Sequence, residues 1–217
     1  MPRIARIVIP GVPHLISQCG NRSEPLFHSA DDRLSYLETL STFLRIDGDR
    51  LWSYRLDDRE LLLVVVPARA ESLAMAIRKT HGAYGRRVNR RQGRTGSLFA
   101  ARFRSCPVDE QYLSVAVRYV ERFEGAPPPE PRCSAGAHCR GTRGPGNCLD
   151  EGLPVSPPDW RAFLTGRDEQ EAIERVLSRL RLGKPAGSPS FVERVEDMTG
   201  LNLSRRPGRP RKPLPAG

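Results

Sequence analysis

The chain has 217 residues, of which 38% are hydrophobic, and carries a formal net charge of +10. This length suits one domain with appendages and is enough to bury a core. The longest apolar run, 61–66, is too short to cross a bilayer, and Pro10 and Pro13 interrupt the apolar stretch near the start. We therefore expect no membrane span and no signal peptide.

The positive charge is carried almost entirely by arginine, because only Lys79, Lys184 and Lys212 are lysines among 35 basic residues. A GC-rich genome favours arginine codons, but a guanidinium also binds phosphate and stacks on bases. Between residues 72 and 108 there is no acidic residue. The basic residues of that window are Arg78, Lys79, Arg86, Arg87, Arg90, Arg91, Arg94, Arg102 and Arg104. Their clustering predicts a surface that binds the phosphate backbone of a nucleic acid.

The periodicity of apolar residues predicts the elements in chain order. Alternation predicts strands at 12–20, 51–55 and 60–66, and residues 98–106 are expected to form a short strand or an arm. Helical spacing predicts helices at 31–44, 70–91, 109–123, 169–182 and after Ser188. This order predicts an α+β, ferredoxin-like antiparallel sheet with helices on one face, followed by C-terminal helices and a basic tail.

Composition divides the chain into four expected segments. Residues 1–124 are predicted to form the DNA-binding domain, and 125–166 an irregular segment that is a domain boundary or a peripheral wrap. Residues 167–200 are predicted to be helical, and 201–217 to be a basic tail that is disordered when free.

The cysteines are odd in number, which argues against a disulfide framework. They stand at 19, 106, 133, 139 and 148. Cys133, His138, Cys139 and Cys148 could be a zinc set, but their spacing matches no common ribbon or finger. Free thiols are the simpler interpretation.

Several short segments resemble, in order, those of bacterial REP-associated tyrosine transposases, which are HUH single-strand DNA transposases of the insertion-sequence type. The matching segments lie at 2–6, 10–14, 18–22, 83–91, 96–99, 102–107, 117–121, 133–138, 159–164, 182–188 and 191–194. The resemblance therefore spans nearly the whole chain.

The resemblance implies a mechanism in which a strand carries His-hydrophobe-His, and the two imidazoles hold Mg²⁺ or Mn²⁺. A tyrosine on a facing helix attacks the phosphate and becomes joined to a 5′ end. Tyr119 matches that nucleophile. Glu60 and Leu62 stand at the two histidine positions, and Phe123 stands at the third-ligand position. We therefore expect no metal cofactor and impaired or lost cleavage.

The tail segment 206–213 resembles an AT-hook core. The alternative interpretation is a plain basic tail. Its candidate DNA-binding residues are Arg206, Arg209, Arg211 and Lys212. Arginine in an extended Gly-Arg-Pro segment can lie along a narrow A·T minor groove.

The leading hypothesis is a transposase-family protein that binds single-stranded or hairpin DNA, as a monomer or homodimer, in the cytoplasm at the nucleoid. One alternative is an active transposase that uses Tyr119 with a non-standard metal site at Glu60. The other is an RNA-binding or nucleoid-organising protein that uses charge alone.

Overall fold

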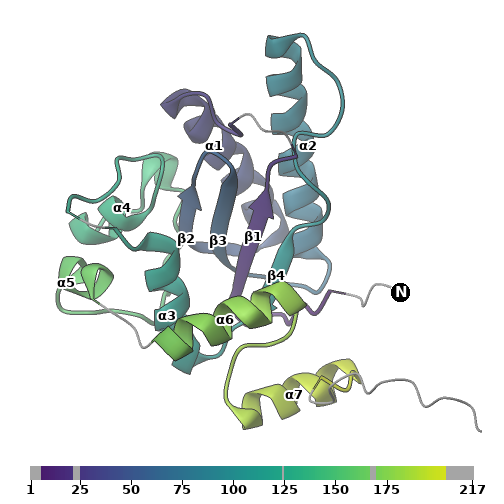
Figure 1. Cartoon of the computed structure of the whole chain (residues 1–217), viewed down its shortest axis with the longest axis vertical. Helices are drawn as coiled ribbons and strands as arrows, with labels where there is room; N and C mark the ends of the chain where they lie inside the picture. The colour runs from purple at the N-terminus through teal and green to yellow at the C-terminus, as the bar shows by residue number, and fades with distance from the viewer. Residues whose placement is uncertain (1–5, 22–24, 124, 167–169, 204–217) are drawn as a thin grey trace, which may run out of the picture.

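The computed structural model describes residues 6–21, 25–123, 125–166 and 170–203. Its centre is a four-stranded antiparallel sheet in the order β2-β3-β1-β4 (Figure 1). The strands are β1 (His14–Cys19), β2 (Arg50–Leu56), β3 (Glu60–Val66) and β4 (Arg104–Pro107). Helix α1 (Ala30–Asp47) joins β1 to β2, and α2 (Ser72–Gln92) joins β3 to β4. This chain path confirms the ferredoxin-like α+β fold predicted from the sequence.

Helices cover both faces of the sheet, whereas the sequence predicted helices on one face only. Leu61, Leu63 and Val65 of β3 pack with the buried faces of α1 and α2. Leu62 and Val64 point to the opposite face, where α3 (Glu110–Glu121) and α6 (Gln170–Leu182) cover them. Successive strand residues face opposite sides, so the unbroken apolar run of β3 requires cover on both. The unbroken apolar sequence of β3 therefore already indicated that both faces of the sheet are covered.

The ends of α1 and α2 follow local rules. Ser29 caps α1 by accepting a hydrogen bond from the Asp32 amide. Both helices end at glycines with positive φ, Gly48 and Gly93, whose amides bond to carbonyls of the last turn. After Gly93 the chain turns back, and residues 96–103 run beside α2 before β4 begins (Figure 1). The segment expected to be a strand or an arm is thus an arm followed by a short strand.

The segment predicted to be irregular, 125–166, contains α4 (Ala135–Arg140) and the short 3₁₀ helix η1 (Pro145–Asn147). Its backbone hydrogen-bonds to the outer edge of β2. The Leu56 amide donates to the Arg132 carbonyl at 2.8 Å, and the Asp150 amide donates to the Leu51 carbonyl at 2.8 Å. This segment covers a sheet edge that would otherwise expose unpaired backbone groups.

Three further helices complete the described chain: α5 (Trp160–Thr165), α6, and α7 (Pro189–Thr199). Helix α5 was not foreseen, whereas α6 and α7 lie where they were predicted. Helix α7 packs Phe191 and Val195 against Ile7 and Ile9 of the N-terminal segment. No helix within the described residues is long and apolar enough to cross a membrane.

Candidate nucleic-acid interface

Tyr119 lies near the end of α3, on the face of that helix that covers the sheet. Its side chain is half-buried and packs against the apolar cluster that contains Leu62. Burial, and after it the Glu60 carboxylate, raise the pKa of the phenol, while Arg55 and Arg181 oppose the rise. The structure therefore brings Tyr119 together with the two positions at which the resemblance places metal-binding histidines.

The carboxylate of Glu60 is already engaged by β1. Ser17 Oγ donates to Glu60 Oε1 at 2.5 Å, and Cys19 Sγ lies 4.0 Å from the same oxygen. Leu62, two residues further along β3, is buried and offers only carbon atoms. Among the residues that the structure describes, no group of three or more His, Cys, Asp or Glu side chains is placed to hold a metal ion.

Phe123, at the expected third-ligand position, points away from this site. It is buried in a separate cluster with Cys133, Ala135 and Leu164. A residue at position 123 therefore packs α3 against the segment around α4 and α5.

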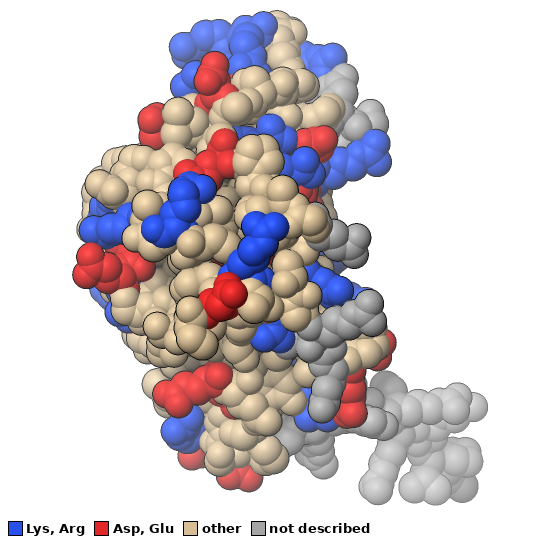
Figure 2. Space-filling model, turned by 90° about the vertical axis from the view of Figure 1, so that its left-hand side faces the viewer, with Lys and Arg blue, Asp and Glu red and all other residues tan. Residues whose placement is uncertain are grey.

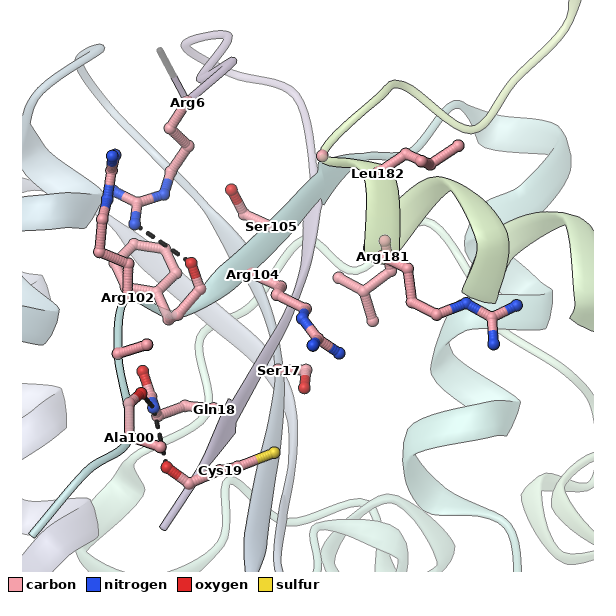
Figure 3. A pocket seen from close by; sticks show the side chains of 14 residues that line it. Arg6, Ser17, Gln18, Cys19, Ala100, Arg102, Arg104, Ser105, Arg181 and Leu182 are labelled. Atoms are coloured by element: carbon pink, nitrogen blue, oxygen red, sulfur yellow. Dashed lines mark hydrogen bonds between the residues drawn. The ribbon is translucent and has the colours of Figure 1, made fainter. Parts of the chain in front are cut away.

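Beside Glu60, an open pocket of about 590 Å³ lies between β1, β4 and the end of α6 (Figure 3). Ser17 and Cys19, which contact Glu60, form part of its wall. Its charged lining residues are Arg6, Arg102, Arg104 and Arg181, and we call this set the arginine pocket. None of the four lies within 4.0 Å of a carboxylate oxygen of a described residue.

Arg6 and Arg102 lie next to each other on one side of the arginine pocket (Figure 3). The Arg6 guanidinium stacks 3.5 Å from the centre of the Phe103 ring and donates to the Phe103 carbonyl at 3.2 Å. Burial, together with the charge of Arg102, lowers the pKa of Arg6 to about 10. Two cations held this close, with no carboxylate partner among the described residues, favour the binding of an anion between or above them.

The structure places seven of the predicted basic residues in two groups. Arg78, Arg86 and Arg102 line a groove between α2 and the 96–103 arm, and Arg104 lines the arginine pocket. Lys79, Arg87 and Arg91 instead contact α1, through Asp47 at 3.9 Å, Ser35 at 2.5 Å and Asp32 at 2.5 Å respectively.

Arg90 and Arg94 are exposed where α2 ends. In Figure 2, basic side chains crowd the top of the molecule, which Figure 1 shows to be that end of α2. The tail residues Arg206, Arg209, Arg211 and Lys212 lie outside the described residues.

The four residues considered as a zinc set are not brought together. Cys148 belongs to the core cluster beneath α1, whereas Cys133 packs with Phe123. His138 bonds through Nδ1 to the buried Glu121 at 2.8 Å and stacks on Trp160, with 4.5 Å between ring centres. All five cysteines are free thiols in the structure.

Sequence reasoning missed two arginines of the pocket. Arg6 stands in a segment that carries the family resemblance, so its position was a usable signal. Arg181 gave none, because α6 mixes acidic and basic residues along its length. It reaches the pocket only because α6 packs against β4 and β1.

No protein-family model and no curated protein matches the sequence. Among solved structures, the chain is similar to a REP-associated tyrosine transposase bound to a REP hairpin. That match has a TM-score of 0.45 and 13% identity, and it covers 55% of this chain and 70% of the other. A likeness this distant assigns no function.

Proposed function

We propose that the chain binds single-stranded or hairpin DNA, as a transposase relative whose metal-dependent cleavage is impaired or lost. The observation that carries the proposal is the arginine pocket, whose Arg181 lies close enough to Tyr119 for its charge to act on the phenol. Four guanidinium groups line one opening without a carboxylate partner among the described residues. A phosphodiester backbone is the ligand that such a surface attracts most strongly.

Among the described residues, the positions expected to hold a metal do not supply the ligands that metal-dependent cleavage needs. Leu62 supplies no ligand atom, and Phe123 is buried away from the site. A divalent ion bound by Glu60 alone would keep too few protein oxygens to be held tightly. The raised pKa of Tyr119 keeps the phenol protonated at neutral pH, which makes it a poor nucleophile without a metal.

The test is binding to a labelled hairpin that carries a single-stranded flank, measured by fluorescence anisotropy over a range of salt. Each phosphate contact contributes roughly −0.7 to the slope of log affinity against log salt for single strands and about −0.9 for duplex. The double variant Arg102→Gln/Arg104→Gln should flatten that slope by about 1.4 to 1.8.

The matched control is Arg50→Gln/Arg140→Gln, which removes the same charge. Arg50 lies on β2, at the opposite edge of the sheet from β4, and Arg140 lies on α4 beside it. Equal flattening in both double variants would show that net charge, not the pocket, attracts the DNA. Stronger binding of RNA than of DNA in a competition experiment would favour the RNA-binding alternative instead.

One observation favours the second candidate, an active transposase: Tyr119 and Glu60 lie close enough for their charges to interact. Incubation with the hairpin and Mn²⁺, followed by denaturation, distinguishes the two candidates. A covalent protein–DNA band that is absent in Tyr119→Phe would establish the active enzyme.

A further inference from the structure

A second opening of the molecule is the groove between α2 and the 96–103 arm. It encloses about 570 Å³, within the range of roughly 300–1,000 Å³ that is typical of ligand sites. It adjoins the arginine pocket, because Arg6, Gln18, Arg102 and Phe103 line both. A strand of nucleic acid that follows the arginine pocket would therefore pass the mouth of this groove.

Flat aromatic and apolar groups form the wall of the groove. Phe99 of the arm stacks on His81 of α2, with 3.7 Å between ring centres and 13° between planes. Burial lowers the pKa of His81 to about 3, so its imidazole is neutral at physiological pH. Ile77, Leu98 and Phe99 line the groove but are almost fully buried, whereas His81 and Phe103 are partly exposed. The Arg6 guanidinium carbon lies 3.5 Å from the centre of the Phe103 ring. Such planar groups are those on which unpaired bases stack.

Two glycines stand within α2 on the side that lines the groove, Gly82 and Gly85. Glycine in a helix interior costs up to about 1 kcal/mol relative to alanine. A Cβ at Gly85 would make only an ordinary contact, 3.8 Å from Leu98 Cβ, so packing within the chain does not require glycine there. The absence of side chains at these two glycines widens the groove for a ligand that enters from solvent.

The rim of the groove is positive. Arg78 and Arg86 project from α2, and Arg6 and Arg102 stand at the end shared with the arginine pocket. No carboxylate of a described residue lies within 4.0 Å of any of the four. The arm itself is strained, since Ala101, which lines both openings, has φ of 42°. Strained backbone is concentrated at functional sites.

We propose that this groove receives one unpaired nucleobase of the bound DNA, while the rim arginines hold the phosphates on either side of it. An apolar, aromatic interior under a cationic rim matches a base with its flanking phosphodiesters better than it matches a peptide or a lipid. The inference rests on the proposed function, because the base arrives as part of a bound strand.

The test uses wild-type protein and hairpins in which each unpaired position in turn is abasic. Removal of the base that occupies the groove should weaken binding about tenfold, or about 1.4 kcal/mol, whereas other positions should change little. The phosphates are retained in every oligonucleotide, so the salt dependence should stay the same. Uniform effects at all unpaired positions would overturn the proposal.

A pair of variants on α2 locates the effect in the groove. Ala74 lines the groove, and Ala74→Leu fills it; Ala83→Leu adds the same volume to the same helix outside it. Ala74→Leu should weaken the intact hairpin about tenfold and remove the sensitivity to the abasic position, whereas Ala83→Leu should retain both.

The outcomes separate this inference from the proposed function. If wild-type protein binds no hairpin, both fail. If it binds with the expected salt dependence but no abasic position is sensitive, DNA binding stands and the base site is wrong. If Ala74→Leu unfolds, the abasic scan on wild-type protein still decides.

Discussion

Arg91, near the end of α2, holds the carboxylate of Asp32, at the start of α1, with both ends of its guanidinium group. Nη1 lies 2.5 Å from Oδ1, and Nη2 lies 2.7 Å from Oδ2. Asp32 is almost fully buried and also accepts a bond from the His28 amide at 3.0 Å. Arg91, which the charge cluster predicted to bind DNA, therefore joins α2 to α1 through an ion pair.

The first prediction is that Arg91→Gln lowers stability more than it weakens DNA binding. Loss of the partner of a buried carboxylate costs about 1–3 kcal/mol. Because the Arg91 side chain is half-exposed and its charge is screened by solvent, we expect a value at the lower end of that range. Urea unfolding measures this change. Arg90→Gln, at an exposed neighbouring position, is the control and should leave stability nearly unchanged.

The pH dependence of that variant follows from Asp32. Its hydrogen bond to Arg91 lowers the pKa of the Asp32 carboxyl, so the folded state favours the charged form. The contribution to stability is complete above the unfolded pKa of about 3.9 and is lost as pH falls through the folded value. The difference between wild type and Arg91→Gln should therefore shrink below about pH 4, and a constant difference would contradict the assignment.

The example of Arg91 shows what the sequence could and could not provide. The acid-free window located the basic surface. Asp32, however, lies 59 residues from Arg91 in the sequence, so no local pattern distinguishes an arginine that joins two helices from one that binds a ligand. Strands β1 to β3 and the long helices were predictable, because each buries residues at a regular spacing. The cover of β2 by 132–150 was not, since it is made largely by backbone groups, such as the Arg132 carbonyl, that carry no sequence signal.

The second prediction concerns the metal site. Titration calorimetry with Mn²⁺ or Mg²⁺ should show no stoichiometric site in the wild-type protein, because Glu60 stands beside Leu62. In Glu60→His/Leu62→His, two imidazoles would project from one face of β3, and weak binding of a transition metal should appear. Leu62→His alone is the control for the effect of a buried imidazole. A wild-type site that disappears in Glu60→Gln would refute this prediction.

The third prediction concerns Glu121, whose side chain is fully buried at the end of α3. Its carboxylate bonds to Ser134 Oγ at 2.5 Å and to His138 Nδ1 at 2.8 Å, and Ser134 Oγ also accepts from the Tyr54 amide of β2. Glu121→Ala leaves these groups without their partner and should cost about 2–4 kcal/mol.

The loss should be largest around α4, so hydrogen exchange should quicken there before it does in β1 or β3. Glu110→Ala, at the exposed start of α3, is the matched control and should show neither effect. An equal loss of protection throughout the sheet would mean that Glu121 supports the whole fold and not the attachment of α4.

The last prediction concerns Tyr119. Without cleavage chemistry, Tyr119→Phe should leave hairpin affinity within about twofold of wild type, since it removes one hydroxyl and no charge at neutral pH. Burial and Glu60 raise the pKa of this phenol, so Glu60→Gln should lower it and bring the onset of tyrosinate absorbance to lower pH.

A covalent band with a pooled hairpin library in Mn²⁺, present in wild type and absent in Tyr119→Phe, would show that the enzyme is active. If the band were stronger in Glu60→Gln than in wild type, the Glu60 carboxylate would be lowering the reactivity of the Tyr119 phenol. The absence of a band across the whole library, with anisotropy still reporting binding, is the result we expect, because the arginine pocket can neutralise a phosphate but supplies no ion to activate the phenol.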